Sequence, residues 1–319
     1  EGNLCHPHSV YFYSKDSEQR NDYILAAEKF DNVACAVGMH RDVFSVYAKR
    51  IERNREPGLV EWTKSLGIWG KGAREKEIPS AAFELTNRQI ALLISRMWEG
   101  DGHINVKSRS LFYATSSQRL ARQLQHLLLR LGMISRLRTV NFPYKDGRVG
   151  YQLFITGNEN LVIFTERIGV YMVSQERKTK LASLCLAAPQ SAGVKDVVPV
   201  AVKQLVRTVK DQHGVTWTQL RELSGGAQRE FYPSAATGKN GFTRQTIQRL
   251  AAAFHSDELR RIGESDIYWD RIVSIDFVGE KQTYDLEVLE THNFIANDIL
   301  VHKSHAADYA VITVQTAYL

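Results

Sequence analysis

The chain has 319 residues with a formal net charge of +6, and 44% of them are hydrophobic. This length accommodates two or three domains with cores of their own, and no apolar run approaches the roughly 18 residues that a membrane span requires. We therefore expect no membrane partner. Three cysteines without a CxxC pair, Cys5, Cys35 and Cys185, indicate a reducing cytoplasm. Because the sequence opens on Glu1 rather than methionine, we expect an initial segment to be missing.

Two units of about 100 residues follow one another along the chain. "EGNL" at Glu1 corresponds to "DGHI" at Asp101, and "LVEWTKSLG" corresponds to "LVIFTERIG", with Lys76 and Lys178 in matching places beyond. Each unit continues with two strand patterns, an amphipathic helix, two more strands and a second helix. This in-register recurrence predicts a duplicated α+β fold with pseudo-two-fold symmetry.

A helix is predicted in front of the second unit's acid. Thr86 is a suitable N-cap, apolar residues recur at helical spacing, and Asp101 stands at the C-terminal tip between two glycines. A carboxylate there is disfavoured by the helix dipole, and a bound cation would compensate for this. If Glu1 ends a matching helix, the two acids meet and hold Mg²⁺, which activates water for phosphodiester attack. The alternative is that Gly-Asp-Gly is only a turn.

Positive charge is concentrated in the second unit. Residues 103–155 contain nine Lys or Arg and one acid, and several of the basic residues alternate with apolar ones on predicted strands. A basic strand face with interleaved aromatic residues suits a phosphate backbone, whereas a merely solvated face usually mixes signs. We therefore predict contacts with a nucleic-acid backbone from six residues: Lys107, Arg109, Arg136, Arg138, Lys145 and Arg148.

The segment "ISRMWEGDG", with "EGNL" as the tail of a first copy, resembles the LAGLIDADG homing endonucleases in their single-chain, two-motif form. The resemblance covers residues 1–185, with repeat one (1–85) lacking its first helix and repeat two at 86–185. It implies the αββαββα repeat, a saddle of two sheets over DNA, metal ligands at Glu1 and Asp101, and catalytic assistance from Lys76 and Lys178. The two lysines could instead be solvated residues at helix ends. A non-cutting DNA-binding module with the same fold is a further alternative.

Residues 186–198 lack a clear period and predict a linker. Helical periodicity returns over residues 199–264, around a glycine-rich loop. This helical subdomain is either a DNA-binding helix-turn-helix, with Arg244 facing DNA, or a plain connector.

Residues 265–303 show a β pattern, and "TYDLEV" and "THNFIANDILVH" resemble the C-terminal blocks of inteins, within the Hedgehog/intein fold. The resemblance implies assisting roles for Asp285 and His292, a penultimate histidine at His302 and a downstream nucleophile at Ser304. Lys303 departs from the asparagine that inteins use there, because lysine has no side-chain amide to attack its own carbonyl. Splicing would also need an N-terminal intein segment in cis, so this chain cannot splice alone.

Residues 304–319, "SHAADYAVITVQTAYL", resemble the bacterial DNA polymerase III alpha subunit and are interpreted as the start of the host protein. The combined hypothesis is a monomeric, cytoplasmic, intein-encoded endonuclease that uses Mg²⁺ to break double-stranded DNA at an intein-less polymerase gene. A splicing element whose nuclease has decayed is the remaining alternative.

Overall fold

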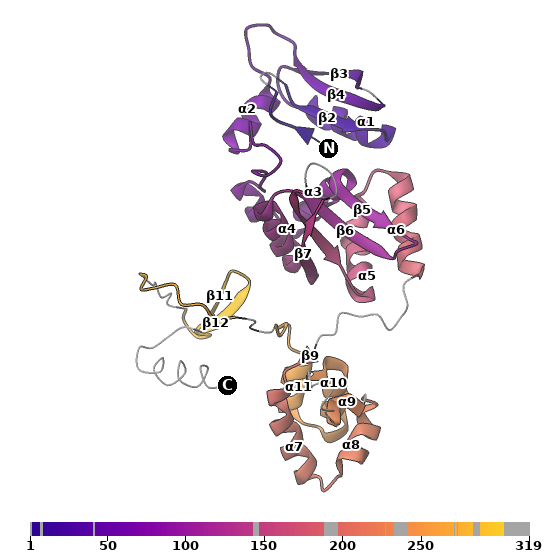
Figure 1. Ribbon diagram of the computed structural model, residues 1–319, viewed down its shortest axis with the longest axis vertical. Coiled ribbons are helices and arrows are strands. Elements are labelled where there is room, and N and C mark those ends of the chain that lie inside the picture. Colours follow the sequence, from indigo (N-terminus) through magenta and orange to yellow (C-terminus); the bar gives the residue numbers. More distant parts are fainter. Residues whose placement is uncertain are drawn as a thin grey trace. The chain divides into compact units, whose positions relative to one another are not determined.

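The computed structural model divides into two compact units, Glu1–Gly263 and Glu264–Leu319, which are described separately (Figure 1). The structure describes residues 2–6, 9–40, 42–142, 147–187, 197–226, 228–232, 241–270, 272, 274–282 and 288–302. Five residues with predicted roles lie outside these ranges, and their roles stay predictions: Glu1, Lys145, Asp285, Lys303 and Ser304.

The first repeat is a four-stranded antiparallel sheet with two helices. Its elements are β1 (Gly2–Asn3), β2 (Tyr11–Ser14), α1 (Ser17–Ala27), β3 (Val33–His40), β4 (Val43–Arg50) and α2 (Gly58–Ser65), and the strand order is β1-β2-β4-β3. Asp16 is the N-cap of α1 and accepts hydrogen bonds from the backbone N–H groups of Glu18 and Gln19. The buried cluster of this repeat is small and consists of Val10, Ala27, Val33, Ala48, Leu59 and Val60.

The second repeat has the same sheet preceded by a long helix. Its elements are η1 (Ser80–Glu84), α3 (Asn87–Asp101), β5 (Gly102–Asn105), β6 (Ser110–Thr115), α4 (Gln118–Arg130), β7 (Ser135–Asn141), β8 (Val149–Ile155), α5 (Asn158–Arg167), η2 (Gly169–Tyr171) and α6 (Gln175–Ala187). The strand order is β5-β6-β8-β7, which repeats the order of the first sheet. The mixed α+β class is therefore confirmed.

The strand registers make the two sheets comparable residue by residue. One row across the first sheet pairs Asn3, Tyr11, Tyr47 and Ala36 in order from β1 to β3. The corresponding row across the second sheet pairs His103, Phe112, Phe154 and Arg136. Residues next to these rows on β4, β6 and β8 point to the opposite face and are buried, as the period of two along a strand requires. Both rows therefore lie on the face away from the core.

Helix α3 is fixed at its start and buried along its length. Thr86 and Gln89 form a capping box, as the predicted N-cap required. Ile90, Ile94 and Trp98 have no exposed surface and join the large core that α3 shares with α4, α5 and α6. This anchoring holds the last residue of α3, Asp101, in a defined place.

Residues 197–263 form a helical subdomain with its own core, built around Phe242, Ile247 and Leu250. Its elements are β9 (Val197–Val198), η3 (Val200–Val202), α7 (Lys203–Gln212), α8 (Trp217–Ser224), α9 (Gln228–Phe231), β10 (Phe242–Thr243), α10 (Arg244–Phe254) and α11 (Asp257–Gly263). The predicted linker is shorter than expected, because α6 continues to Ala187 and β9 begins at Val197. No helix in the described part of the chain is long and apolar enough to cross a membrane.

The second unit contains a single described hairpin of β11 (Asn293–Ala296) and β12 (Ile299–His302). Asn297 and Asp298 both have positive φ, as a tight two-residue hairpin turn requires. The strands expected earlier in this segment are not formed by the described residues of 267–282. Phe277 is 93% exposed and Ile275 is 84% exposed there, so these apolar side chains have no neighbouring layer to cover them.

Candidate functional site

Asp101 ends α3 and is half-buried, with the hydroxyl of Tyr113 donating to its Oδ2 across 3.3 Å. Among the described residues, Asp101 forms no ion pair. The chain turns sharply after Asp101 and passes close to Trp98. A Cβ on Gly102 would lie 2.2 Å from the carbonyl oxygen of Trp98. The glycine that follows the acid is thus required by space, and it lets α3 pass directly into β5.

Helix α6 is tied to this corner of the structure by one arginine. Nη1 of Arg177 donates to the carbonyl oxygen of Gly102 across 2.9 Å and to that of Trp98 across 3.1 Å. Arg177 precedes Lys178 in the chain, and Gly102 follows Asp101. The structure therefore brings the backbone segments of these two predicted catalytic residues together. Within the described residues, no hydrogen bond or ion pair joins the side chains of Asp101 and Lys178.

Glu99 also holds this corner, although the sequence pattern did not single it out. Its side chain is 3% exposed, and its Oε1 accepts hydrogen bonds of 2.7 Å from the backbone N–H groups of Val173 and Ser174. Burial raises the pKa of the Glu99 carboxyl, while these hydrogen bonds and the charge of Arg96 act in the opposite direction. The signal that could have identified Glu99 is its place in "WEGDG", two residues before Asp101 on the same helix end.

The two predicted catalytic lysines occupy equivalent turns. The N–H of Lys76 donates to the carbonyl of Gly72 across 3.1 Å, and the N–H of Lys178 donates to the carbonyl of Ser174 across 3.0 Å. Both lysines are half-buried. The correspondence seen in the sequence thus extends to the backbone, which is more than two solvated lysines at unrelated helix ends would share.

The outward face of the second sheet combines aromatic rings with positive charge. The rings of His103 and Phe112 lie 4.6 Å apart, and those of Phe112 and Phe154 lie 4.9 Å apart. The guanidinium of Arg138 lies 4.8 Å above the Phe154 ring, and Arg136 is exposed beside it. Cations above aromatic faces are held in place without losing their charge. This face therefore offers two positive groups at its outer strand, and one of them, Arg138, is held over a ring.

The equivalent face of the first sheet is chemically different. Tyr11 and Tyr47 stack at 5.4 Å, where the second sheet has Phe112 and Phe154. The positions of Arg136 and Arg138 are taken by Ala36 and Gly38. Among the described residues, Lys49 is the cation that contacts the Tyr11–Tyr47 row, and its Nζ lies 5.0 Å above the Tyr47 ring. The outward face of the second sheet thus carries Arg136 and Arg138 on its outer strand, where the first sheet has no charge.

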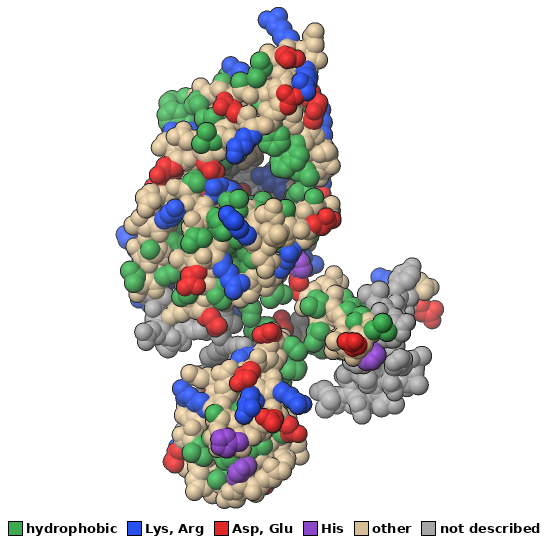
Figure 2. Space-filling model, turned by 180° about the vertical axis from the view of Figure 1, so that it is seen from behind, with side chains coloured by type: hydrophobic (Ala, Val, Ile, Leu, Met, Phe, Trp, Pro, Cys, Tyr) green, Lys and Arg blue, Asp and Glu red, His purple; other side chains and the backbone are tan. Residues whose placement is uncertain are grey.

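The other residues predicted to bind DNA fall into two groups. Lys107 and Arg109 are exposed in the β5–β6 turn, and Arg148 is exposed just before β8. Arg244 is half-buried, and its Nη1 donates to the carbonyl of Ile262 across 3.0 Å and to that of Gly263 across 3.4 Å. Arg244 therefore joins the start of α10 to the end of α11, and a role for it in DNA binding stays a prediction. Figure 2 shows Lys and Arg side chains interspersed with acidic ones elsewhere on the surface.

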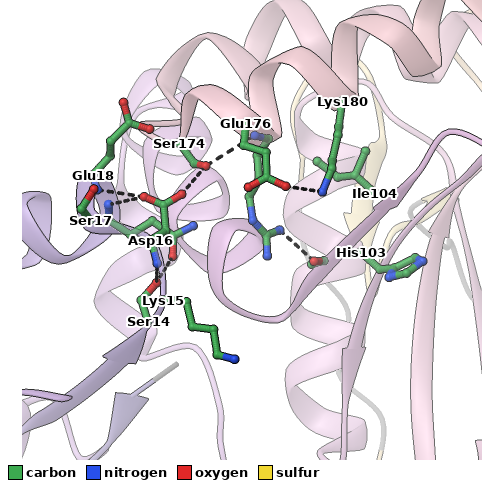
Figure 3. Close-up of a pocket in the computed structure, with 13 residues that line it drawn as sticks. Ser14, Lys15, Asp16, Ser17, Glu18, His103, Ile104, Ser174, Glu176 and Lys180 are labelled. Carbon is green, nitrogen blue, oxygen red and sulfur yellow. Dashed lines mark hydrogen bonds and ion pairs between the residues drawn. The ribbon is translucent and has the colours of Figure 1, made fainter. Parts of the chain in front are cut away.

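A cavity of about 800 Å³ lies where the two repeats meet (Figure 3). Lys15 and Asp16 line it from the start of α1, and His103, Arg177 and Lys180 line it from β5 and α6. Within the described part of the chain, no three His, Cys, Asp or Glu side chains gather as a metal site. Since Glu1 lies outside the described residues, Asp101 is the one predicted metal ligand whose position the structure describes.

In the second unit, the predicted splicing residues flank the hairpin. His292 is exposed directly before β11, and His302 ends β12 opposite Asn293. The hairpin register thus brings the backbones of the two histidines to one end of the β-ribbon. Asp285, Lys303 and Ser304 lie outside the described residues, so the rest of this site is untested.

Residues 88–169 match the family model of the LAGLIDADG-like domain, so a domain of this kind lies in the second repeat. The prediction of such a domain is confirmed. The chain is 37% identical over 321 residues to the replicative DNA helicase DnaB of Rhodothermus marinus, covering 96% of this chain and 33% of the helicase. It is 32% identical to DnaB of Synechocystis sp., covering 96% of this chain and 36% of that protein. The chain spans about a third of the length of these curated relatives.

Other relatives are more distant. Protein RecA of Mycobacterium tuberculosis is 25% identical over 79% of this chain and 34% of its own length. Among solved structures, a variant of the homing endonuclease I-DmoI covers 52% of this chain and 82% of its own at 10% identity and a TM-score of 0.38. The homing endonuclease I-WcaI bound to its DNA recognition sequence covers 57% of this chain and 80% of its own at 10% identity and a TM-score of 0.37.

Proposed function

We propose that the first unit is a site-specific endonuclease that cuts double-stranded DNA with the help of a divalent metal ion. The observation that carries this proposal is the placement of Asp101. Its carboxylate stands at the end of the buried helix α3, is free of ion pairs among the described residues, and is braced through Gly102 by Arg177. This corner lies in the LAGLIDADG-like domain, whose sheet carries arginines on its outward face.

The metal ion best suited to this site is Mg²⁺. Carboxylate oxygens are its preferred protein ligands, and one or two of them together with substrate phosphates are enough to bind it. Asp101 fits this requirement, and Glu1 would supply the second carboxylate. A bound Mg²⁺ would activate a water molecule and neutralise charge on the phosphate. Lys76 and Lys178 would stabilise the additional charge that develops as the phosphodiester bond breaks.

DNA would lie across the outward faces of the two sheets. Arg136, Arg138, Lys107, Arg109 and Arg148 are all exposed on or beside the second sheet, where they can neutralise phosphates. The Phe154 ring beneath Arg138 would help to hold that guanidinium over the duplex. The chain would act as a monomer, because its two repeats already supply both halves of the binding surface.

We further propose that residues 265–303 belong to the C-terminal part of a protein-splicing domain. The exposed apolar side chains of this unit, with Phe277 as the extreme case, would be covered by further strands of that domain. The similarity to DnaB over 96% of the chain favours a replicative helicase as host. The polymerase III alpha host suggested by residues 304–319 gains no support from these relatives.

The test is DNA cleavage by the purified chain in Mg²⁺. The substrates are plasmids that carry an uninterrupted helicase gene or an uninterrupted polymerase III alpha gene. Site-specific linearisation of one plasmid, lost in Asp101→Asn while DNA affinity is kept, would support the endonuclease and identify the host. Specific binding without nicking would instead establish the non-cutting module. If the chain neither binds nor cuts either plasmid, the splicing element with a decayed nuclease is the better description.

A further inference from the structure

A segment near the end of each repeat, residues 72–78 in the first and 174–180 in the second, is bound by the N-terminus of a helix in the other repeat. We call this segment the tail of its repeat. Ser117 is the N-cap of α4 in the second repeat, and its side chain is completely buried. While its Oγ accepts from the N–H of Leu120, its hydroxyl donates to the carbonyl oxygen of Lys76 across 2.6 Å. Lys76 belongs to the first repeat. A buried donor of this kind fixes the carbonyl it serves, because leaving either group unpaired is costly.

The contact continues over the two residues that follow Lys76. The side-chain amide of Gln123, nearly two turns further along α4, donates to the carbonyl of Ile78 across 3.2 Å and accepts from its N–H across 2.8 Å. Between them, Arg119 pairs with Glu77 at 2.7 Å. The first repeat's tail therefore lies along the first turns of α4, and Lys76 starts this contact.

We call such a contact between a helix start in one repeat and the tail of the other a crossing. The second crossing resembles the first. Asp16 is the N-cap of α1 in the first repeat, and its Oδ2 accepts a short hydrogen bond from the buried hydroxyl of Ser174 in the second repeat (Figure 3). Next to it, the carboxylate of Glu18 accepts from the N–H of Gln175 across 2.7 Å. Ser174 is also the residue whose carbonyl receives the N–H of Lys178. The turn that carries Lys178 is thus fastened to α1.

The two crossings are related by the pseudo-symmetry of the repeats. The helices α1 and α4 follow the second strand of each sheet, and their N-caps, Asp16 and Ser117, occupy equivalent places. The chemistry is reversed, since Ser117 donates to the tail whereas Asp16 accepts from it. The outcome is the same, because in each case a lysine of one repeat depends on a helix start in the other.

We infer that Asp16 and Ser117 are positioning residues that act across the repeats, with Ser117 setting Lys76 and Asp16 setting Lys178 through Ser174. The consequence for catalysis rests on the proposed endonuclease function. If each lysine serves one of the two strand cuts, damage to one crossing slows the cut served by the lysine of the opposite repeat. Loss of stability alone would slow both cuts alike.

The variants are chosen to break each crossing while leaving the helix start intact. Ser117→Gly removes the donor to Lys76, and glycine is among the residues tolerated at an N-cap. Asp16→Ser keeps one capping oxygen for α1 but removes the second oxygen that Ser174 reaches. Ser117→Thr keeps the hydroxyl that caps α4 and donates to Lys76. Asp16→Asn keeps the capping oxygen of α1 and can hold the Ser174 contact in the reverse direction, with its side-chain amide donating to the hydroxyl oxygen. These two variants are the matched controls.

Two measurements on the full chain separate the inference from the function on which it rests. Hydrogen–deuterium exchange should show faster exchange over residues 72–78 in Ser117→Gly and over residues 174–180 in Asp16→Ser, with the other tail unchanged in each. Nicking of a substrate labelled on both strands should show the ratio of the two cutting rates shifting by about tenfold, in opposite directions in the two variants.

The outcomes are distinct. If a variant speeds hydrogen exchange equally in both tails, or in neither, the inference is overturned whatever the cleavage activity. If each variant speeds exchange only in the tail of the opposite repeat, but the ratio of the two strand-cutting rates is unchanged, the catalytic part of the inference is overturned. The same pattern of exchange in a chain whose wild type cuts no DNA would support the positioning and reject the proposed endonuclease.

Discussion

Arg177 binds the carbonyl oxygens of both Trp98 and Gly102, so one guanidinium closes the corner where α3 ends and β5 begins. This corner places Asp101 between the two carbonyls in sequence. The side chain that fixes the geometry of the acid therefore comes from α6, about 75 residues later in the chain.

Replacing Arg177 should loosen Asp101 without removing any proposed ligand. We expect Arg177→Met to lower the free energy of unfolding by roughly 1–3 kcal/mol, the usual worth of hydrogen bonds from a charged group. Cleavage should slow by about tenfold or more, because small displacements of a reacting group are costly. Lys180→Met removes the same charge from the next turn of α6 and is the control. Equal cleavage rates in the two variants would show that the Arg177 contacts do not matter for the reaction.

Gly102 should tolerate no side chain, whereas its counterpart Gly2 should. A methyl group on Gly102 would lie 2.2 Å from backbone and ring atoms of Trp98, but one on Gly2 meets nothing closer than 3.7 Å. We expect Gly102→Ala to destabilise the fold by about 3 kcal/mol or more, because the buried Trp98 cannot move aside. Gly2→Ala should change the unfolding midpoint in urea very little. Similar midpoints for the two variants would contradict the tight turn.

The arginines of β7 should govern the salt dependence of DNA binding. Each phosphate contact contributes about one unit to the slope of log affinity against log salt. The double variant Arg136→Gln/Arg138→Gln should therefore flatten the slope by about two units in a fluorescence anisotropy titration. Arg122→Gln, an exposed arginine on α4 on the other side of the sheet, should leave it unchanged. If the double variant keeps the wild-type slope, these side chains do not face the phosphates.

Glu99 should make the fold less stable at neutral pH than at mildly acidic pH. Because its pKa is raised in the folded chain, the folded chain gains a proton first as the pH falls, so this group favours folding more strongly toward its usual pKa of 4.5. The unfolding free energy of Glu99→Gln relative to wild type should therefore be most favourable at pH 7 and decline toward pH 4.5. Chemical denaturation across this range measures it, with the exposed Glu166→Gln as control. A difference that is constant with pH would mean that Glu99 is not perturbed by burial.

The repeat and its strands could be predicted because they depend on local patterns. Alternation along β6 and β8 and the N-cap at Thr86 are written in neighbouring residues, and the spacing from Lys76 to Lys178 follows from duplication. The crossings at Ser117 and Asp16 could not be predicted, since they join residues 41 and 158 positions apart. The hydrogen bonds of Arg244 to Ile262 and Gly263 on α11 could not be predicted either, and its role in DNA binding stays a prediction.

The strands expected over residues 267–282 show a second limit of sequence patterns. Their apolar residues alternate as a strand requires, yet Ile275 and Phe277 stay exposed because the described chain offers no layer to receive them. A β pattern records the environment for which a segment was selected. It does not supply that environment.

The unequal outer strands of the two sheets give the proposed complex a direction along the duplex. Arg136 and Arg138 lie at one end of the surface, and Ala36 and Gly38 lie at the other. The protein would bind one half of its target through phosphate contacts and would recognise the other half by shape complementarity. Exchanging the two half-sites would place the strongly held end on the wrong sequence. A palindrome made from either half should be a poorer substrate than the natural asymmetric site.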